Sequence, residues 1–459
     1  MQSAATNTPE GGDIPKTLHP CLSALDLTLL GIGAIIGAGI FVITGIAAAT
    51  QAGPAIVLSY ILAGLASVFC ALAYAELASS VGGCGSAYGY AYAGIGRFAA
   101  WIIGWDLLME YGMNTATISI GWSGYVDHLL SSVGLGLPTY LTHDPFSGGI
   151  VNLPAMLIIM ALAWLLTFGT KKGAMFNNII VYIKLLVISL FVVVGLTHIN
   201  SENWHPFLPF GAKGIVNGAG LIFFAFIGFD AVSTAGEEAK NPKRDLPVGI
   251  LASLIVCTLV YVIVAAVLTG IMPYPELNVS SAVSTALLSY GHKFTAEVVA
   301  VGAIAGLTTA ILAFYYGFTR VFLAMSRDGF LPKKAAVINN KTGSPNQLIW
   351  TAAIFMALFA GLLPITQIAN LVNIGTLAAF IAVCLSVMFL RVKKPDMPRP
   401  FKMPLNPLFP VLGTALCIYL MATLPLITWI SFSIWTGAGI ALYYLYSKKS
   451  NLRSDPLKG

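Results

Sequence analysis

Charged residues are scarce in this chain. Only 9% of its 459 residues are Asp, Glu, Lys or Arg, whereas 57% are hydrophobic. A soluble protein of this length would have too little polar surface to cover its core, so the composition excludes an ordinary soluble fold. The polar–apolar alternation of an outer-membrane barrel is also missing. The chain has instead a series of apolar runs of about 20 residues, which is typical of a polytopic helical membrane protein.

Residues that hold metals or perform acid–base chemistry are few as well. The cysteines show neither metal-binding nor disulfide spacing, and no histidine pairs visibly with a nucleophile. The sequence therefore predicts no metal, no cofactor and no enzyme active site, and it lacks the repeated filter motif of a channel. The cysteines are Cys21, Cys70, Cys84, Cys257, Cys384 and Cys417. The histidines, in tails, loops or at the ends of apolar runs, are His19, His128, His143, His198, His205 and His292.

Twelve apolar runs are long enough to cross a lipid bilayer as helices. They predict membrane spans at about 24–50, 54–80, 97–127, 152–169, 172–197, 214–238, 248–272, 294–323, 347–365, 367–391, 407–425 and 428–447.

Basic residues are distributed unevenly between alternate loops. Of the 24 Lys and Arg residues, only Lys213 and Lys293 fall on one side of the membrane, and Lys184 alone lies within a span. Because basic loops stay in the cytoplasm, this asymmetry and the even number of spans predict that both termini are cytoplasmic. The net charge of +6 follows from this topology, and we expect no nucleic-acid partner.

Lys184 lies in the middle of an apolar run. If its helix starts near Lys172, Lys184 lies about 18 Å along it, near the bilayer midplane. A charge at this depth costs about 2.5–3.5 kcal/mol, so such a residue is a functional candidate. Burial favours the neutral form of a lysine, which makes proton exchange feasible near neutral pH. The alternative is a permanently charged lysine that only pairs with backbone carbonyls.

Two spans carry residues that interrupt helices. The first span has four glycines within residues 31–39, each costing about 1 kcal/mol relative to alanine in a helix. The sixth span carries Gly228 and Asp230 in its apolar run 223–231. Glycines can simply let helices pack closely. The other interpretation is an unwound segment that exposes backbone N–H and C=O groups to a polar cavity.

The two interruptions occupy equivalent places in two five-span halves. An odd number of spans per half inverts the second half, which is typical of secondary transporters. We expect a segment at 1–22, repeats at 23–200 and 201–395, two further helices within 396–447, and a tail at 448–459. The positive end of a half-helix suits a carboxylate, and unpaired carbonyls suit an ammonium group. A broken-helix site can thus bind a zwitterion through its backbone.

Four segments resemble amino acid permeases of the amino acid–polyamine–organocation (APC) superfamily. They are 33–41 (GAIIGAGIF), 224–230 (FAFIGFD), 237–242 (EEAKNP) and 320–329 (RVFLAMSRDG), and the last resembles the cationic amino acid transporter family and its bacterial relatives. The likeness runs from about residue 20 to 445. It implies an all-α membrane fold of twelve helices, with a LeuT-like five-plus-five inverted repeat, in the plasma membrane, which for a bacterium is the inner membrane.

The resemblance also implies a substrate site. The substrate carboxylate is expected at the N–H groups of Ala38 and Gly39, and the ammonium at the carbonyls of Ile35, Phe224 and Ile227. Phe224 corresponds to the aromatic gate of the superfamily. The substrate-binding set it implies is Ile35, Gly37, Ala38, Gly39, Phe224, Ala225, Ile227 and Phe314.

The resemblance implies proton coupling too. Lys184 corresponds to a lysine that takes the sodium position in proton-dependent members, with carbonyls of 31–33 and the hydroxyls of Thr308 or Thr309 as expected neighbours. Glu110 shares a helix face with Asp106, four residues earlier. These carboxylates are candidates to relay protons or to sense the substrate amine through water, and the alternative is a plain contact with helix ends. Asp230 is expected to cap backbone amides.

Phe314 determines the expected substrate class. A phenyl ring in the distal pocket offers no anionic partner to a cationic side chain, and an unpaired buried charge is costly. We therefore expect proton-coupled symport of small to medium neutral L-amino acids such as alanine across the lipid bilayer. The alternatives are transport of arginine or lysine, amino acid exchange, and an amino acid sensor that moves nothing. A small accessory membrane subunit is compatible with the sequence but cannot be read from it.

Overall fold

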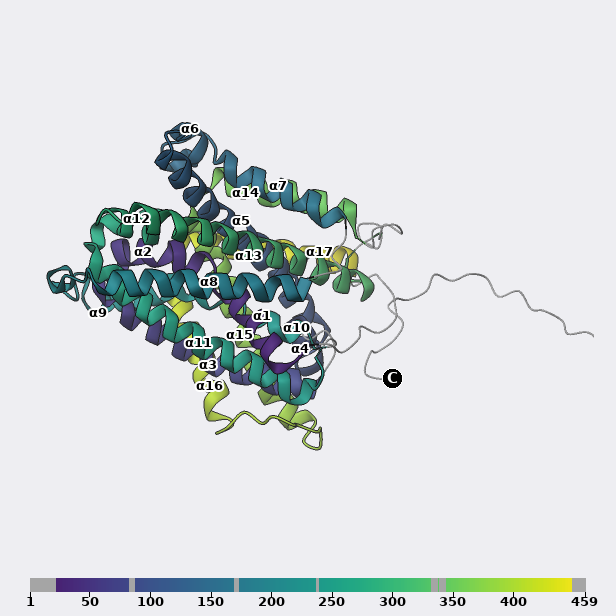
Figure 1. Ribbon diagram of the computed structural model, residues 1–459. Coiled ribbons are helices and arrows are strands. Elements are labelled where there is room, and N and C mark those ends of the chain that lie inside the picture. Colours follow the sequence, from purple (N-terminus) through teal and green to yellow (C-terminus); the bar gives the residue numbers. More distant parts are fainter. Residues whose placement is uncertain are drawn as a thin grey trace, which may run out of the picture.

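The computed structural model describes residues 22–81, 87–168, 173–236, 239–331, 337 and 344–447. Within these ranges the regular secondary structure is helical, apart from one isolated bridge between Leu22 and Ala239. Figure 1 shows a bundle of long helices running in nearly one direction. Parts of the predicted 237–242 motif, the N-terminal segment and the C-terminal tail lie outside the described residues.

The first half contains the first broken helix and four further spans. Its elements are α1 (Ala24–Ile35), η1 (Gly39–Ile43), α2 (Thr44–Ala47), η2 (Ala48–Ala52), η3 (Gly53–Ala55), α3 (Ile56–Ser80), α4 (Ala87–Gly94), α5 (Arg97–Ser132), α6 (Thr139–Thr142), η4 (Pro145–Ser147), α7 (Leu153–Thr167), α8 (Gly173–Leu196) and η5 (Ser201–Trp204).

The second half repeats this plan, and two helices follow it. Its elements are α9 (Gly211–Ile222), η6 (Phe223–Phe226), α10 (Ala231–Thr234), α11 (Pro242–Ile271), η7 (Tyr274–Leu277), α12 (Ala282–Leu288), α13 (Lys293–Arg327), α14 (Asn346–Leu362) and α15 (Ile365–Lys393). The last helices are α16 (Leu408–Ala422), α17 (Leu426–Leu442) and η9 (Tyr443–Ser447).

Each of the twelve predicted spans corresponds to a helix or to a broken helix in the described part of the chain. Seven segments qualify as membrane spans by length and apolar composition, and α7, α14 and α16 are shorter apolar helices. Three helices exceed their predicted bounds by four to six residues, and α13 is one of them, continuing to Arg327. α5 continues to Ser132, and α11 begins at Pro242, where the Asp245 carboxylate accepts the Asn241 N–H at 3.1 Å.

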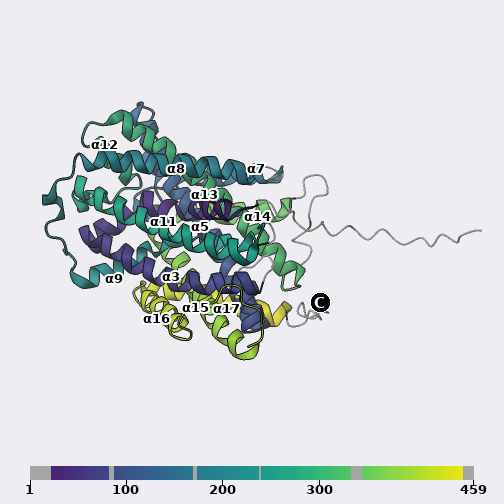
Figure 2. The same cartoon turned by 60° about the horizontal axis from the view of Figure 1, so that its bottom comes forward.

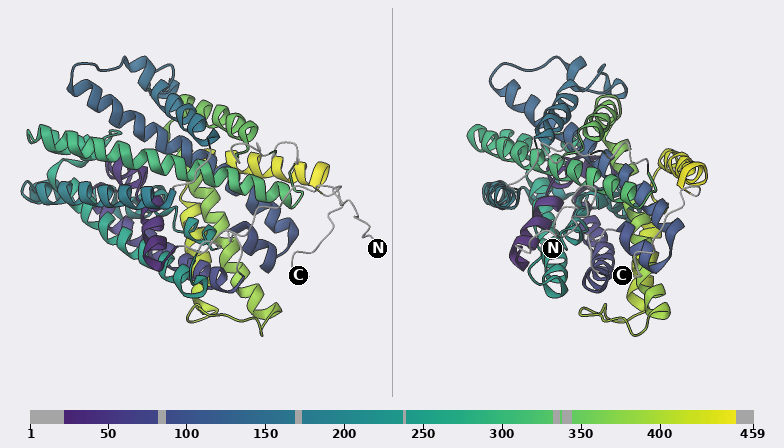
Figure 3. Two further views of the ribbon diagram at one scale, coloured as in Figure 1. Left: turned by 45° about the vertical axis from the view of Figure 1, so that its right-hand side comes forward. Right: turned by 90° about the vertical axis from the view of Figure 1, so that its right-hand side faces the viewer.

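The broken helix α1 lies in the interior of the bundle, packed against α8, α10, α11 and α13. Figure 2 shows α15, α16 and α17 grouped along one side of the bundle. The pair α7 and α14 lies on a different edge from α16 (Figure 1). The right panel of Figure 3 looks along the bundle, so that several of its helices are seen end-on. Exposed apolar side chains on α8, α11 and α17, such as Leu186, Leu259 and Ile434, suit contact with lipid.

The first interruption lies at Ile36 and Gly37. Helix α1 starts with a capping box between Ser23 and Asp26 and ends at Ile36, whose ψ of 96° is extended. The chain becomes helical again at Gly39, in a wide π-helical turn. The structure therefore confirms the predicted break, which includes the third of the four glycines.

The second interruption lies at Ile227 and Gly228. Helix α9 tightens into a 3₁₀ turn, Ile227 is extended with a ψ of 132°, and Gly228 has a φ of 125°. A Cβ atom at Gly228 would lie 2.8 Å from the carbonyl carbon of Ala34, so only glycine allows this close approach to α1. A Cβ atom at Gly39 would likewise overlap the Cα and Cβ atoms of Ala225. The two breaks therefore face each other in the interior.

Candidate functional site

The amide groups after the first break form one part of the candidate site. Ala38 and Gly39 stand at the start of the resumed helix, where N–H groups have no carbonyl of their own helix to bind. The partial positive charge of a helix start adds to these donors. Ile35, Ala38 and Gly39 are buried, as are Phe224, Ala225 and Ile227 across the gap. This backbone can accommodate an anionic group.

The carbonyl groups at the breaks have a partner that the sequence did not reveal. The Tyr261 hydroxyl, from α11, lies 2.7 Å from the Ile35 oxygen and 2.8 Å from the Ala225 oxygen. The Phe224 carbonyl accepts the Ile227 N–H at 3.3 Å. A carbonyl has two lone pairs, so each of these oxygens keeps the capacity for one more donor. Tyr261 thus connects the two breaks and orients the Ile35 carbonyl, one of the three expected to bind an ammonium group.

Aromatic residues connect α13 and α5 to the second break. Phe314 on α13 is 5% exposed and lies 5.9 Å, between ring centroids, from Tyr111 on α5. The Tyr111 hydroxyl in turn donates to Asp230 at 3.4 Å. Asp230 also accepts the Gly228 N–H at 3.2 Å, which is the amide-capping role expected for it. Phe314 therefore packs on the aromatic residue that contacts the second break.

Lys184 is fully buried, and its ammonium group reaches the first break. The Nζ atom lies 2.9 Å from the Gly33 oxygen and 2.8 Å from the Ile36 oxygen. Gly33 belongs to the predicted carbonyl stretch 31–33, whereas Ile36 lies beyond it, at the break itself. Among the described residues no carboxylate lies within ion-pair distance of Lys184. The negative end of the α1 dipole is thus the main electrostatic partner of this cation.

Helix α13 passes directly beside the lysine. A Cβ atom at Gly306 would lie 2.8 Å from the Cε atom of Lys184, so this glycine makes room for the side chain. The Thr308 and Thr309 hydroxyls donate to the Ile304 and Gly306 carbonyls of their own helix. Thr308 also accepts the Trp122 indole N–H at 2.9 Å. The threonines therefore lie on the helix that contacts Lys184, with their hydroxyl protons already bound.

Asp106 and Glu110 are buried on α5, facing α15. Asp106 lies against Gly375, where a Cβ atom would be 2.8 Å from the Asp106 Oδ1 atom. Glu110 faces the Thr376 hydroxyl without a hydrogen bond of normal geometry. Within the described part of the chain, no donor reaches the carboxylate oxygens of either residue. Such groups are costly to bury as ions, which makes them unusual components of a membrane interior.

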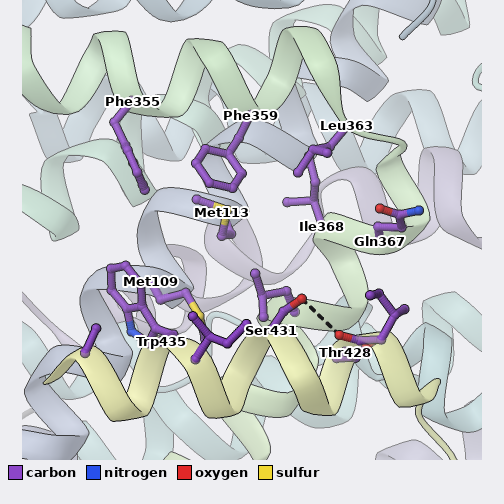
Figure 4. Close-up of a pocket in the computed structure, with 14 residues that line it drawn as sticks. Met109, Met113, Phe355, Phe359, Leu363, Gln367, Ile368, Thr428, Ser431 and Trp435 are labelled. Carbon is purple, nitrogen blue, oxygen red and sulfur yellow. Dashed lines mark hydrogen bonds between the residues drawn. The ribbon is translucent and has the colours of Figure 1, made fainter. Parts of the chain in front are cut away.

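An apolar pocket lies beside the same face of α5, where Met109 packs against Gly375. Its cavity of about 320 Å³ is enclosed by α5, α14, α15 and α17 (Figure 4). Met109, Phe359 and Trp435 point into it, and Gln367, Thr428 and Ser431 are its polar lining residues. No charged side chain lines this pocket, so it offers no partner for either charge of a zwitterion. The two breaks, not this pocket, form the candidate site.

Comparison with known proteins covers almost the whole chain. A family model described as "Amino acid permease" matches residues 22–446. A methylthioribose transporter of Bacillus subtilis (strain 168) is 46% identical over 439 residues, which is 95% of each chain. The branched-chain amino acid permease BcaP of the same organism is 46% identical over 95% of this chain and 94% of its own. Cationic amino acid transporter 4 of Homo sapiens is 34% identical over 85% of this chain and 63% of its own.

Proposed function

This chain belongs to the amino acid permease family, and we propose that it is a proton-coupled symporter of small to medium neutral L-amino acids such as alanine. The chain is a multi-pass membrane permease of a family of transporters, not of enzymes. The contact of Lys184 with the carbonyls of the first break is the observation that carries the proposal. The protein would act in the cell membrane, with both termini in the cytoplasm.

The substrate backbone would bind across the two breaks. Its carboxylate would accept the N–H groups of Ala38 and Gly39, directly after Gly37. Its ammonium would donate to the free lone pairs of Ile35, Phe224 and Ile227. Phe224 and Ala225 would cover the substrate from the second break. A zwitterion is favoured here because the same gap offers donors on one side and acceptors on the other.

Phe314 is proposed to limit the substrate side chain. Its ring packs on Tyr111 and offers contact area to an apolar group but no anionic partner to a guanidinium or ammonium. The 46% identity to a permease named for branched-chain amino acids supports a neutral substrate. Relatives named as cationic amino acid transporters, at 33–35% identity, support the cationic alternative.

Lys184 is proposed to couple the proton to the opening of the site. Because α1 stops at the first break, the Gly33 and Ile36 oxygens accept no N–H group of their own helix and can accept the lysine instead. A protonated lysine therefore binds these oxygens only when the helix is broken. Loss of the proton would remove one donor and the charge, and would weaken the link between α8 and α1. The proton would thereby control the broken helix that binds substrate. Glu110, Thr308 and Thr309 remain proposed members of the proton path.

Uptake by purified protein in liposomes tests the proposal. Labelled alanine should accumulate when the outside is more acidic than the lumen, without sodium, and excess leucine should compete better than arginine. Sodium-dependent uptake without a pH response would contradict proton coupling. Counterflow that is insensitive to a pH gradient would identify an exchanger, and binding without flux a sensor. Competition by methylthioribose but by no amino acid would contradict a zwitterion site, because this ligand has neither charged group.

A further inference from the structure

Two histidines distant in sequence meet at one end of the bundle. His198 follows the end of α8, and His292 immediately precedes α13. Their Nε2 atoms are 3.1 Å apart, and their ring centroids are 4.6 Å apart. Neither residue has a predicted role, and 94 positions separate them. The basic-residue distribution predicts that this end faces the outside of the cell.

The tautomer of His198 is fixed by its neighbours. Its Nδ1 atom lies 3.1 Å from the Val194 carbonyl oxygen, which can only accept a hydrogen bond. The Thr197 hydroxyl donates to the same carbonyl at 2.7 Å, so its oxygen is an acceptor for Nδ1–H at 2.8 Å. Nδ1 therefore carries the proton, and Nε2 presents its lone pair to His292. A ring N–H bound to a backbone carbonyl is the arrangement that orients metal-binding histidines.

The separation of the two Nε2 atoms suits a shared metal ion. Zinc–nitrogen bonds of about 2.0–2.1 Å at a tetrahedral angle place two nitrogen ligands about 3.3 Å apart. The observed 3.1 Å needs only a small adjustment of the rings. For His292 to bind through Nε2, the hydrogen on this atom must move to Nδ1, a change of tautomer that exchange with solvent allows.

The surroundings leave space for further ligands from water. Both histidines are half-buried, so one side of the pair is open to solvent. Among the described residues no group of three or more His, Cys, Asp or Glu side chains gathers as a metal site, so the protein would supply two ligands. Tyr290 packs on His198 at 5.0 Å between ring centroids. The nearby Lys293 ammonium contacts Glu297 at 3.9 Å and the Ser132 carbonyl at 3.4 Å, which reduces its repulsion of a cation.

We propose that His198 and His292 bind a divalent transition-metal ion of the Zn²⁺ and Ni²⁺ class, and that the bound ion ties the end of α8 to the start of α13. Helix α8 carries Lys184, and α13 carries Gly306 against the lysine side chain. A metal bridge at their ends restrains the movement of one helix along the other. Zn²⁺ applied from the histidine side therefore slows transport. The slowing of transport by Zn²⁺ rests on the proposed function, whereas metal binding does not.

Metal binding is tested on the full-length protein in detergent, with any affinity tag removed. Isothermal titration with ZnCl₂ should show one site that His198→Ala and His292→Ala each weaken at least tenfold. His143→Ala is the matched control, because this histidine lies elsewhere, against Thr142, and should leave the site unchanged. The site should also weaken in acid, where protonated imidazoles have no lone pair to give. Equal Zn²⁺ binding by the wild type and both variants would overturn the proposal.

Transport supplies the second readout. Zn²⁺ should inhibit alanine uptake by the wild type, and the His198→Ala and His292→Ala variants should need at least tenfold more Zn²⁺ for the same inhibition. Intact uptake by the zinc-saturated wild type would overturn the restraint on α8 and α13. A protein that binds Zn²⁺ as described but moves no amino acid would instead contradict the proposed function, because binding alone does not depend on transport.

Discussion

At the scale of single residues, the surroundings of Lys184 explain how an ammonium group is kept inside the bundle. Its two partners are carbonyls of the last turn of α1, which lack N–H partners because the helix stops. In an unbroken helix the Gly33 oxygen would bind the N–H of Gly37. The hydrogen bonds of the buried lysine therefore exist only because the helix is broken, and the lysine supplies a donor to carbonyls that the break leaves without one. This reciprocal arrangement is the physical basis of the proposed coupling between protonation of Lys184 and α1.

Replacement of Gly306 by alanine should displace the Lys184 side chain without removing its charge. The added Cβ would lie 2.8 Å from the Cε atom of the lysine and would displace the side chain from its two carbonyls. We expect alanine uptake to fall at least tenfold while the protein still elutes as a folded species. Gly437→Ala is the control, because nothing lies within 4 Å of the added atom in α17. Unchanged uptake by Gly306→Ala would show that the position of Lys184 is not critical.

Replacement of Tyr261 by phenylalanine should loosen the connection between the two breaks. The change removes the single hydroxyl proton that the Ile35 and Ala225 oxygens share, a contribution of about 0.5–1.5 kcal/mol. Thermal unfolding in detergent should occur several degrees lower, and the KM for alanine should rise because the carbonyls lose their orientation. Thr258→Val, one turn earlier on α11, removes a hydroxyl that bonds only its own helix and should change KM little. A Tyr261→Phe variant with wild-type KM would contradict this role.

At the scale of elements, a buried carboxylate fixes the segment between α15 and α16. Glu76 on α3 accepts the Arg391 side chain at 2.9 and 2.5 Å and the Met403 N–H at 2.7 Å. Arg399 lies 3.5 Å from the same carboxylate. The two helices outside the repeat are thus attached to the first half by charge as well as by apolar contact. Arg391 lies 315 positions from Glu76, so no spacing rule in the sequence identifies this partner.

Neutralising Glu76 should weaken this attachment. Glu76→Gln leaves Arg391 and Arg399 without their buried counter-charge, which should lower the free energy of unfolding by up to about 3 kcal/mol. Thermal unfolding monitored by intrinsic fluorescence measures the loss. Glu297→Gln is the control, because its exposed pair with Lys293 is worth at most about 1 kcal/mol. Equal stabilities of the two variants would mean that the Glu76 network contributes nothing beyond a surface pair.

At the scale of the whole molecule, apolar run lengths and glycine placement were sufficient to predict the span order and both breaks. Those features are local, so the sequence carries them directly. The partners of each break are not local. Tyr261 lies 226 positions from Ile35, and His198 and His292 lie 94 positions apart, so no spacing rule brings them together. The Ile36 contact of Lys184 was missed because it depends on where the helix stops, not on the residue type.

For the whole molecule, the proposal is that protons cross the membrane together with the substrate. Liposomes that contain the protein and a pH-sensitive dye should acidify inside when alanine is added outside, without any imposed gradient or sodium. The Lys184→Met variant, of similar length but without an ammonium group, should show no alanine-dependent acidification. Exposed Lys213→Met should behave as the wild type. Alanine entry without acidification in the wild type would contradict proton-coupled symport. Equal acidification by the wild type and Lys184→Met would contradict the role of Lys184 in coupling.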